Sequence, residues 1–182
     1  MARGRPSKKQ QLLDTARWVF AANGYQGTSI DLVVQEAGVS KPTVYNNFPT
    51  KQALLQALLA QLTDELDGIR ADLLENSEAS VDAVISVYLN VASKAEYLMI
   101  YRILCGEHYK LDEVTRNQIL FFDQVQHDDC LSALSAAGVP VPELVLMFCR
   151  DQVIGRALKA LPGDELPGAD ELSFQLKTLI AA

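Results

Sequence analysis

A glycine-centred turn between two short amphipathic segments carries the residues whose types and spacing fit a specific chemistry. Residues 29–48 read SIDLVVQEAGVSKPTVYNNF. Ala37 is small enough to let two helices approach, and Gly38 can adopt a turn conformation that is costly for other residues. Val39 would fill the angle between the helices, and Ser40 would cap the second helix. The pattern predicts a helix-turn-helix, whose second helix enters the major groove of DNA.

Catalytic and metal-binding patterns are weak in this sequence. Asp123 and His127 are four residues apart and would share a helical face, but the chain has two histidines and no Glu-x-x-His repeat. It has no P-loop, no G-x-S-x-G motif and no Cys/His zinc spacing. We therefore expect no catalytic residue, no metal and no cofactor, and a protein that is not an enzyme. The alternative is a helical-bundle enzyme or metal or redox sensor whose basic head is incidental.

Charge separates the two ends of the chain, although the net charge is −7. Residues 1–51 hold seven basic and three acidic groups, whereas residues 52–182 hold nine basic and 20 acidic groups. A basic head on an acidic body fits a protein that meets a polyanion at one end. A solvated charge imbalance without any partner is the alternative.

The three cysteines and the length of the apolar runs indicate in which cellular compartment the protein is expected. Cys105, Cys130 and Cys149 are odd in number and widely spaced, which argues against a disulfide framework and fits a reducing compartment. Whether any of them senses oxidants stays open. No apolar run approaches 18 residues, and the basic N-terminus leads into no apolar segment. These features predict a cytoplasmic protein without a membrane span.

Helical periodicity runs through nearly the whole chain, and strand alternation is absent. We expect an all-α fold of about nine helices. Ser7 and Gln10 form a capping-box pattern for the first helix, and a C-cap signal at Asn23 and Gly24 ends it. The expected helices are 7–23, 29–37, 40–48, 50–75, 79–93, 94–107, 111–137, 141–160 and 169–181.

Residues 8–56 resemble the TetR family of bacterial transcriptional regulators. The resemblance implies a DNA-binding domain over 1–49, made of three helices with the helix-turn-helix. A helical effector-binding and dimerisation domain over 50–182 would follow. The long helix over 50–75 would join the two, and its tilt would couple them. The residues that carry the resemblance are Gly24, Tyr25, Thr28, Ala37, Gly38, Val39, Ser40, Tyr45, Phe48, Lys51, Leu54 and Leu55.

The resemblance also implies roles for individual residues. Thr28, Tyr45 and Lys51 would contact phosphates through two hydroxyls and an ammonium at the start of a helix. Arg3 and Arg5 flank a glycine and suit a narrow minor groove, or else form a basic tail that makes only diffuse contacts. The candidates for base edges and thymine methyls are Lys41, Pro42, Thr43 and Asn46.

A homodimer is expected because two helix-turn-helix copies on a two-fold axis reach successive major grooves, roughly 34 Å apart. The segments 141–160 and 169–181 are rich in apolar side chains, and the first is apolar all round at 144–149. We expect them to form a four-helix interface with the partner chain. A buried core helix in a monomer is the alternative. The apolar residues of the second segment are Leu172, Phe174, Leu176, Leu179 and Ile180.

The function that these expectations describe is a ligand-responsive transcriptional regulator, a repressor, that binds a palindromic DNA operator and is released by a small molecule. Pockets between bundle helices are mostly apolar with a few polar groups. Tyr101, Phe122 and Gln124 are the candidate ligand contacts. Because no arginine cluster occurs in these helices, we expect a small apolar or aromatic, uncharged effector. The operator, the regulated genes, the effector and repression versus activation stay open.

Overall fold

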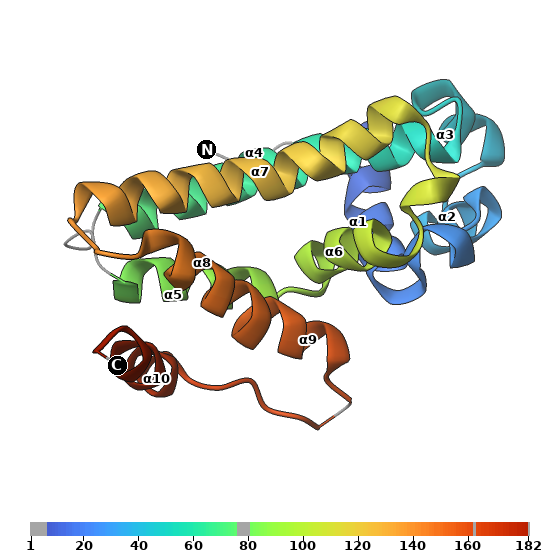
Figure 1. Ribbon diagram of the computed structural model, residues 1–182. Coiled ribbons are helices and arrows are strands. Elements are labelled where there is room, and N and C mark those ends of the chain that lie inside the picture. Colours follow the sequence, from blue (N-terminus) through green and yellow to red (C-terminus); the bar gives the residue numbers. More distant parts are fainter. Residues whose placement is uncertain (1–6, 76–80, 162, 182) are drawn as a thin grey trace, which may run out of the picture.

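The computed structural model describes residues 7–75, 81–161 and 163–181, and every regular element within them is helical. This confirms the expected all-α fold. Figure 1 shows α1, α2 and α3 at one end, which we call the head, and the remaining helices, which we call the body. The helices are α1 (Lys8–Gly27), α2 (Ile30–Ala37), α3 (Lys41–Asn47), α4 (Lys51–Glu75), α5 (Val81–Ala92), α6 (Ala95–Gly106), α7 (Glu113–Ala136), α8 (Pro142–Cys149), α9 (Arg156–Lys159) and α10 (Ala169–Ala181), with the 3₁₀ turn η1 (His108–Lys110) and the π-helical segment η2 (Arg150–Gly155).

Serine side chains start all three helices of the head. The hydroxyls of Ser7, Ser29 and Ser40 each accept a hydrogen bond from the backbone N–H three residues ahead. Gly38 ends α2 in the left-handed conformation, with φ 61° and ψ 36°. The caps at Ser7 and Ser40 and the turn at Gly38 are those that the sequence predicts, because each depends on a residue within one turn of its partner.

The first helix is interrupted where its sequence predicts an end. Gly24 has φ 67° and ψ −174°, outside the helical region, and a further turn continues to Gly27. The predicted stop is therefore a break within α1, and the chain turns there before α2 begins. Tyr25, directly after the break, is buried and stacks on Phe20 with ring centroids 6.4 Å apart.

The two longest helices of the body, α4 and α7, run parallel. Near the head, the amide of Gln56 donates to the hydroxyl of Thr115 at 2.8 Å. Fourteen residues further along both helices, the guanidinium of Arg70 donates to Asp129 and to Asp67, each at 2.7 Å. The apolar side of α4 is buried along Leu55, Leu58, Leu62 and Leu66.

The predicted helix over 141–160 is continuous but not uniform. The segment η2 inserts six π-helical residues between α8 and α9, and a Cβ atom at its last residue, Gly155, would lie 3.5 Å from the backbone oxygen of Arg150. Such segments widen one turn and redirect the side chains that follow. Counted as one helix with α8 and α9, this stretch gives nine α-helical units in the described residues, as expected. No described helix is long and apolar enough to cross a membrane.

Two glycine substitutions should shift stability in opposite directions. A methyl group at Gly38 would meet no atom within 4 Å. Gly38→Ala should therefore lower the free energy of unfolding by about 1–2 kcal/mol, because only the left-handed backbone conformation opposes the new side chain. Gly68 is an exposed residue of α4, and a methyl group there would also meet no atom within 4 Å. Gly68→Ala should therefore raise the free energy of unfolding by about 0.5–1 kcal/mol. Urea unfolding followed by circular dichroism measures both. Equal effects of the two variants would contradict the assigned conformation of the turn.

Candidate nucleic-acid interface and ligand region

One face of α3 is open to solvent and carries most of the predicted base-reading residues. Lys41, Pro42 and Asn46 are exposed, and the Tyr45 side chain is 44% exposed. The opposite face packs into the head through Val44. Positions three and four residues apart share a helical face, so these side chains present one surface. The methyl-bearing side chain of the remaining candidate, Thr43, is half-buried, and its hydroxyl lies 2.8 Å from that of Ser40.

The ammonium of Lys41 already has an acidic partner. It lies 2.6 Å from a carboxylate oxygen of Asp31 on α2, and this contact raises the pKa of Lys41. Both side chains are exposed, and surface ion pairs of this kind contribute little to stability. A base or phosphate can therefore compete for Lys41 at small cost.

Lys51 holds two parts of the head together. Its ammonium donates to the backbone oxygens of Tyr25 at 2.7 Å and of Thr28 at 2.8 Å, and lies 4.2 Å from the centroid of the Tyr25 ring. Burial lowers the pKa of Lys51. An ammonium has three N–H groups, so one remains for another acceptor. The structure thus gives Lys51 a structural task, and its phosphate contact stays a prediction.

Thr28 differs most from its predicted role. The side chain is 1% exposed, and its hydroxyl donates to the backbone oxygen of Gly24 at 2.8 Å. In this arrangement the hydroxyl closes the break in α1 and does not face solvent. A direct phosphate contact from this hydroxyl would require the side chain to turn outward. The two arginines of the predicted arm, Arg3 and Arg5, lie outside the described residues.

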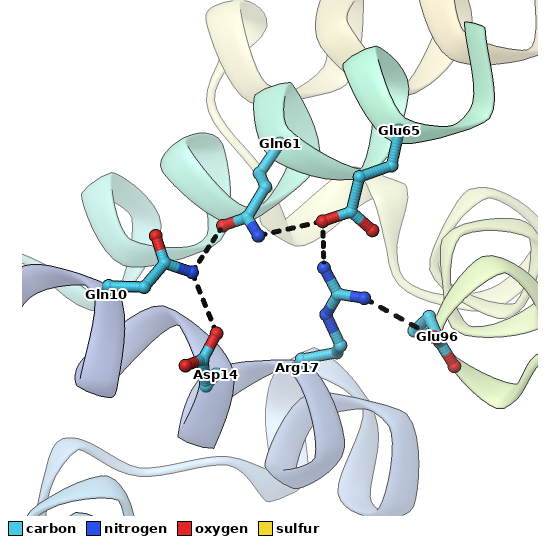
Figure 2. Close-up of polar contacts among 6 residues, drawn as sticks. All are labelled: Gln10, Asp14, Arg17, Gln61, Glu65 and Glu96. Atoms are coloured by element: carbon cyan, nitrogen blue, oxygen red, sulfur yellow. Dashed lines mark hydrogen bonds and ion pairs between the residues drawn. The ribbon is translucent and has the colours of Figure 1, made fainter. Parts of the chain in front are cut away.

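Arg17 belongs to the contact between head and body, although its charge counts toward the basic head. Its guanidinium lies 2.5 Å from Glu65 of α4 and 3.6 Å from Glu96 of α6. The hydrogen bond with Glu65 raises the pKa of Arg17. Figure 2 shows this cluster, which continues through Gln61 to Gln10 of α1. Sequence reasoning misses it because its members lie on three helices far apart in the chain.

The predicted ligand contacts are only partly brought together. Tyr101 and Phe122 are buried with their ring centroids 6.1 Å apart in an edge-on arrangement, and Tyr97 lies 6.0 Å from Phe122. Gln124 is exposed instead, and its amide donates to Asp128. An α-helix turns about 100° per residue, so a side chain two positions after Phe122 points away from the core. Gln124 therefore lies apart from the two aromatic residues.

Polar groups that the sequence did not single out lie near these aromatic rings. Arg150, the first residue of η2, pairs with Asp123 of α7. Burial raises the pKa of Tyr88 and of Tyr101, both close enough to feel these two charges. On α7, Gln126 is 1% exposed, and neither atom of its amide has a hydrogen-bond partner among the described residues. Buried polar groups are normally paired, so this amide is a candidate to bind a ligand.

A hollow lies between α4 and α7. Its volume of about 560 Å³ is within the range of small-molecule sites. Phe121 forms part of it and is 59% exposed, although the neighbouring Phe122 points into the core. The sequence gives no sign of this groove, because it depends on how two helices pack. The lining residues are Leu59, Ala60, Thr63, Asp64, Val114, Asn117, Gln118 and Phe121.

Comparisons with known proteins agree with this geometry. Residues 12–58 match the profile described as "Bacterial regulatory proteins, tetR family". The transcriptional regulator RutR of Escherichia coli (strain K12) is 29% identical over 130 residues, which cover 68% of this chain and 60% of RutR. A TetR-family transcriptional regulator from Agrobacterium tumefaciens superposes with a TM-score of 0.77 over 96% of both chains, at 18% identity.

Over residues 12–58 the chain is similar to the TetR family. AibR, solved in complex with isovaleryl coenzyme A and operator DNA, superposes with a TM-score of 0.72 and 19% identity over 95% of this chain and 97% of AibR. At such identities the structural likeness shows the fold alone. The chain spans 31% to 60% of the length of the curated relatives that it matches. Those relatives are named as transcriptional regulators.

Thiol reactivity should separate one cysteine from the other two. Burial raises the pKa of the Cys130 and Cys149 thiols to about 12, whereas Cys105 is exposed. The thiolate is the reactive form. Iodoacetamide at pH 8 should therefore modify Cys105 alone in the folded protein and all three thiols in 6 M guanidinium, as read by mass spectrometry. Rapid modification of Cys130 or Cys149 in the folded protein would favour a redox-sensing role.

Proposed function

We propose that this chain is a TetR-family, ligand-responsive transcriptional regulator, a repressor, that binds a palindromic operator as a homodimer. A small molecule bound in the body would release the DNA. The observation that carries the proposal is the exposed face of α3, where Lys41, Pro42, Tyr45 and Asn46 project from a helix-turn-helix with capped helices. The family match over 12–58 and the operator DNA bound by AibR support it.

The contacts of each head divide by chemistry. Tyr45 is the exposed hydroxyl for a phosphate, and the third N–H of Lys51 is a second donor. Lys41 and Asn46 can read guanine and adenine edges. Arg3 and Arg5 would add a minor-groove contact ahead of α1. The operator-binding unit of the chain is residues 1–49, and residues 50–182 sense the ligand and dimerise.

Apolar side chains left exposed on α8 and α10 support the dimer. Met147 on α8 is 68% exposed, and Phe174 and Leu179 on α10 are 74% and 47% exposed. Other apolar residues of the same helices, such as Leu172 and Leu176, are buried within the chain. Each helix thus has a second apolar surface that the chain itself does not cover, which a partner chain would bury.

The effector region of the proposal is the part of the body around Tyr101 and Phe122. Arg150 is neutralised by Asp123, so the region offers no free charge to an anionic or cationic ligand. The amide of Gln126 offers both a donor and an acceptor. A small apolar or aromatic molecule with one polar group fits this set. The acyl coenzyme A of AibR shows that the fold accommodates a small molecule in the presence of operator DNA.

DNA binding by α3 is tested with Lys41→Ala and Tyr45→Phe. A duplex is first selected from genomic fragments with the wild-type protein, and fluorescence anisotropy then gives its affinity at several salt concentrations. We expect each variant to lose about 1–3 kcal/mol of binding free energy, and Lys41→Ala to lower the salt dependence by about one ion. Lys159→Ala removes the same charge from the exposed surface of α9 and should bind as wild type. Equal losses in all three variants, or no selected duplex, would refute the proposal.

The dimer is tested by introducing charge into the exposed apolar surface. Met147→Glu with Phe174→Glu should give a species of 20.0 kDa in light scattering, because two carboxylates would be buried in the interface. The wild type should have twice this mass. Leu120→Glu alters an apolar residue of α7 that is 49% exposed and should leave the mass unchanged. A monomeric wild type would contradict the dimer. A dimer that persists in the double variant would show that the interface lies elsewhere.

A further inference from the structure

The end of α6 reaches directly into the break of α1. Glu107 follows the last residue of α6, and its carboxylate accepts a hydrogen bond from the backbone N–H of Gln26 at 2.6 Å. The other carboxylate oxygen lies beside Gly24, so close that a Cβ atom there would be 2.6 Å away. The glycine therefore has two tasks: it permits the backbone to turn, and it leaves room for the carboxylate.

The turn between α6 and α7 also holds the beginning of α4. Asp112 caps α7, and the amide side chain of Gln52, oriented to satisfy both groups, donates to its carboxylate at 2.8 Å and accepts from its N–H at 3.2 Å. One turn further along α7 and α4, Gln56 donates to Thr115. The six residues from 107 to 112 thus contact α1 and α4, the helices directly before and after the helix-turn-helix.

We propose that Glu107 is a positioning residue for DNA binding, which fixes the head against α6 by holding the broken end of α1. The positive charge of Lys51 supports the negative charge of Glu107 at this break in α1. The Lys51 ammonium binds the backbone oxygens of Tyr25 and Thr28, directly after the break. The proposal rests on the proposed function, because positioning matters only for a head that binds DNA. Together with the Arg17–Glu96 pair, it connects the head to α6 as well as to α4.

The consequence is that α6 can move the head without a tilt of α4. Tyr101 lies on α6, in the region proposed for the effector, and Glu107 follows less than two turns later. A displacement of α6 along or about its axis would carry Glu107 with it. The hydrogen bond from the N–H of Gln26 would then either break or draw the end of α1 along with α6. The head would then lose the orientation that two operator half-sites require.

Substitutions at Glu107 test the position of the head directly. Spin labels on Glu36→Cys in the head and Ser132→Cys in the body, in a Cys105→Ser background diluted with unlabelled chain, report the intrachain distance. Glu107→Ala should broaden this distance distribution and speed amide hydrogen exchange of Gln26 about tenfold, since a single hydrogen bond protects it. Glu107→Gln keeps an accepting oxygen and should stay close to wild type. Glu113→Ala removes an exposed carboxylate in the first turn of α7 and should change neither readout.

Affinity for the selected duplex completes the test. Glu107→Ala should bind it about tenfold more weakly, because an unfixed head must be ordered on binding, while Glu107→Gln and Glu113→Ala bind as wild type. Unchanged distances and exchange in Glu107→Ala would overturn the positioning role. Altered distances with wild-type affinity would show that the contact does not serve DNA binding. If the wild type itself binds no duplex, the proposed function fails, whatever Glu107 does to the distances.

Discussion

The break in α1 at Gly24 is the constraint on which the arrangement of the head depends. A helix that continued straight through this residue would carry Tyr25 and Thr28 past the positions from which they meet α4. Because the backbone turns there, three groups find partners at one corner: the Thr28 hydroxyl, the Lys51 ammonium and the Glu107 carboxylate. Each of these bonds uses a backbone atom that the broken helix leaves unpaired. The contacts at this corner therefore give the backbone groups at the break hydrogen-bond partners and also join the head to the body.

Head and body share one apolar core, and polar contacts add to their junction at its partly exposed edge. Arg17 reaches Glu65 and Glu96, and Lys51 reaches two carbonyls, all with side chains that are half-buried. Hydrogen bonds and partly exposed ion pairs contribute about 1 kcal/mol each, far less than the burial of several leucines. The polar contacts are therefore the weaker part of this junction. A change in the position of the head would break them at a lower cost than separating the shared apolar core.

The sequence predicts the features of the fold that depend on neighbours in the chain. The caps at Ser7 and Ser40, the turn at Gly38 and the exposed face of α3 all arise within a few residues, so spacing alone reveals them. Thr28, Lys51 and Gln124 are different, because their surroundings come from other helices or from the exact rotation of their own. A hydroxyl or an ammonium in the sequence shows what bond it can make, but packing decides whether the partner is a phosphate or a carbonyl. Glu107 and Arg17 are missed for the same reason, since their partners lie 81 and 48 residues away.

The buried amide of Gln126 suggests where the energy for a change of state can come from. A buried polar group without a partner costs about 1–3 kcal/mol, and a ligand that hydrogen-bonds to it recovers this amount only in the bound state. Coupling between two sites is typically of the same size, about 1–3 kcal/mol. Gln126 lies on α7, whose first residues adjoin Asp112 and Glu107, so a displacement of α7 acts on the turn that holds the head. The free energy recovered by a single satisfied amide is thus comparable with that of the few hydrogen bonds by which this turn holds Gln26, Gln52 and Gln56.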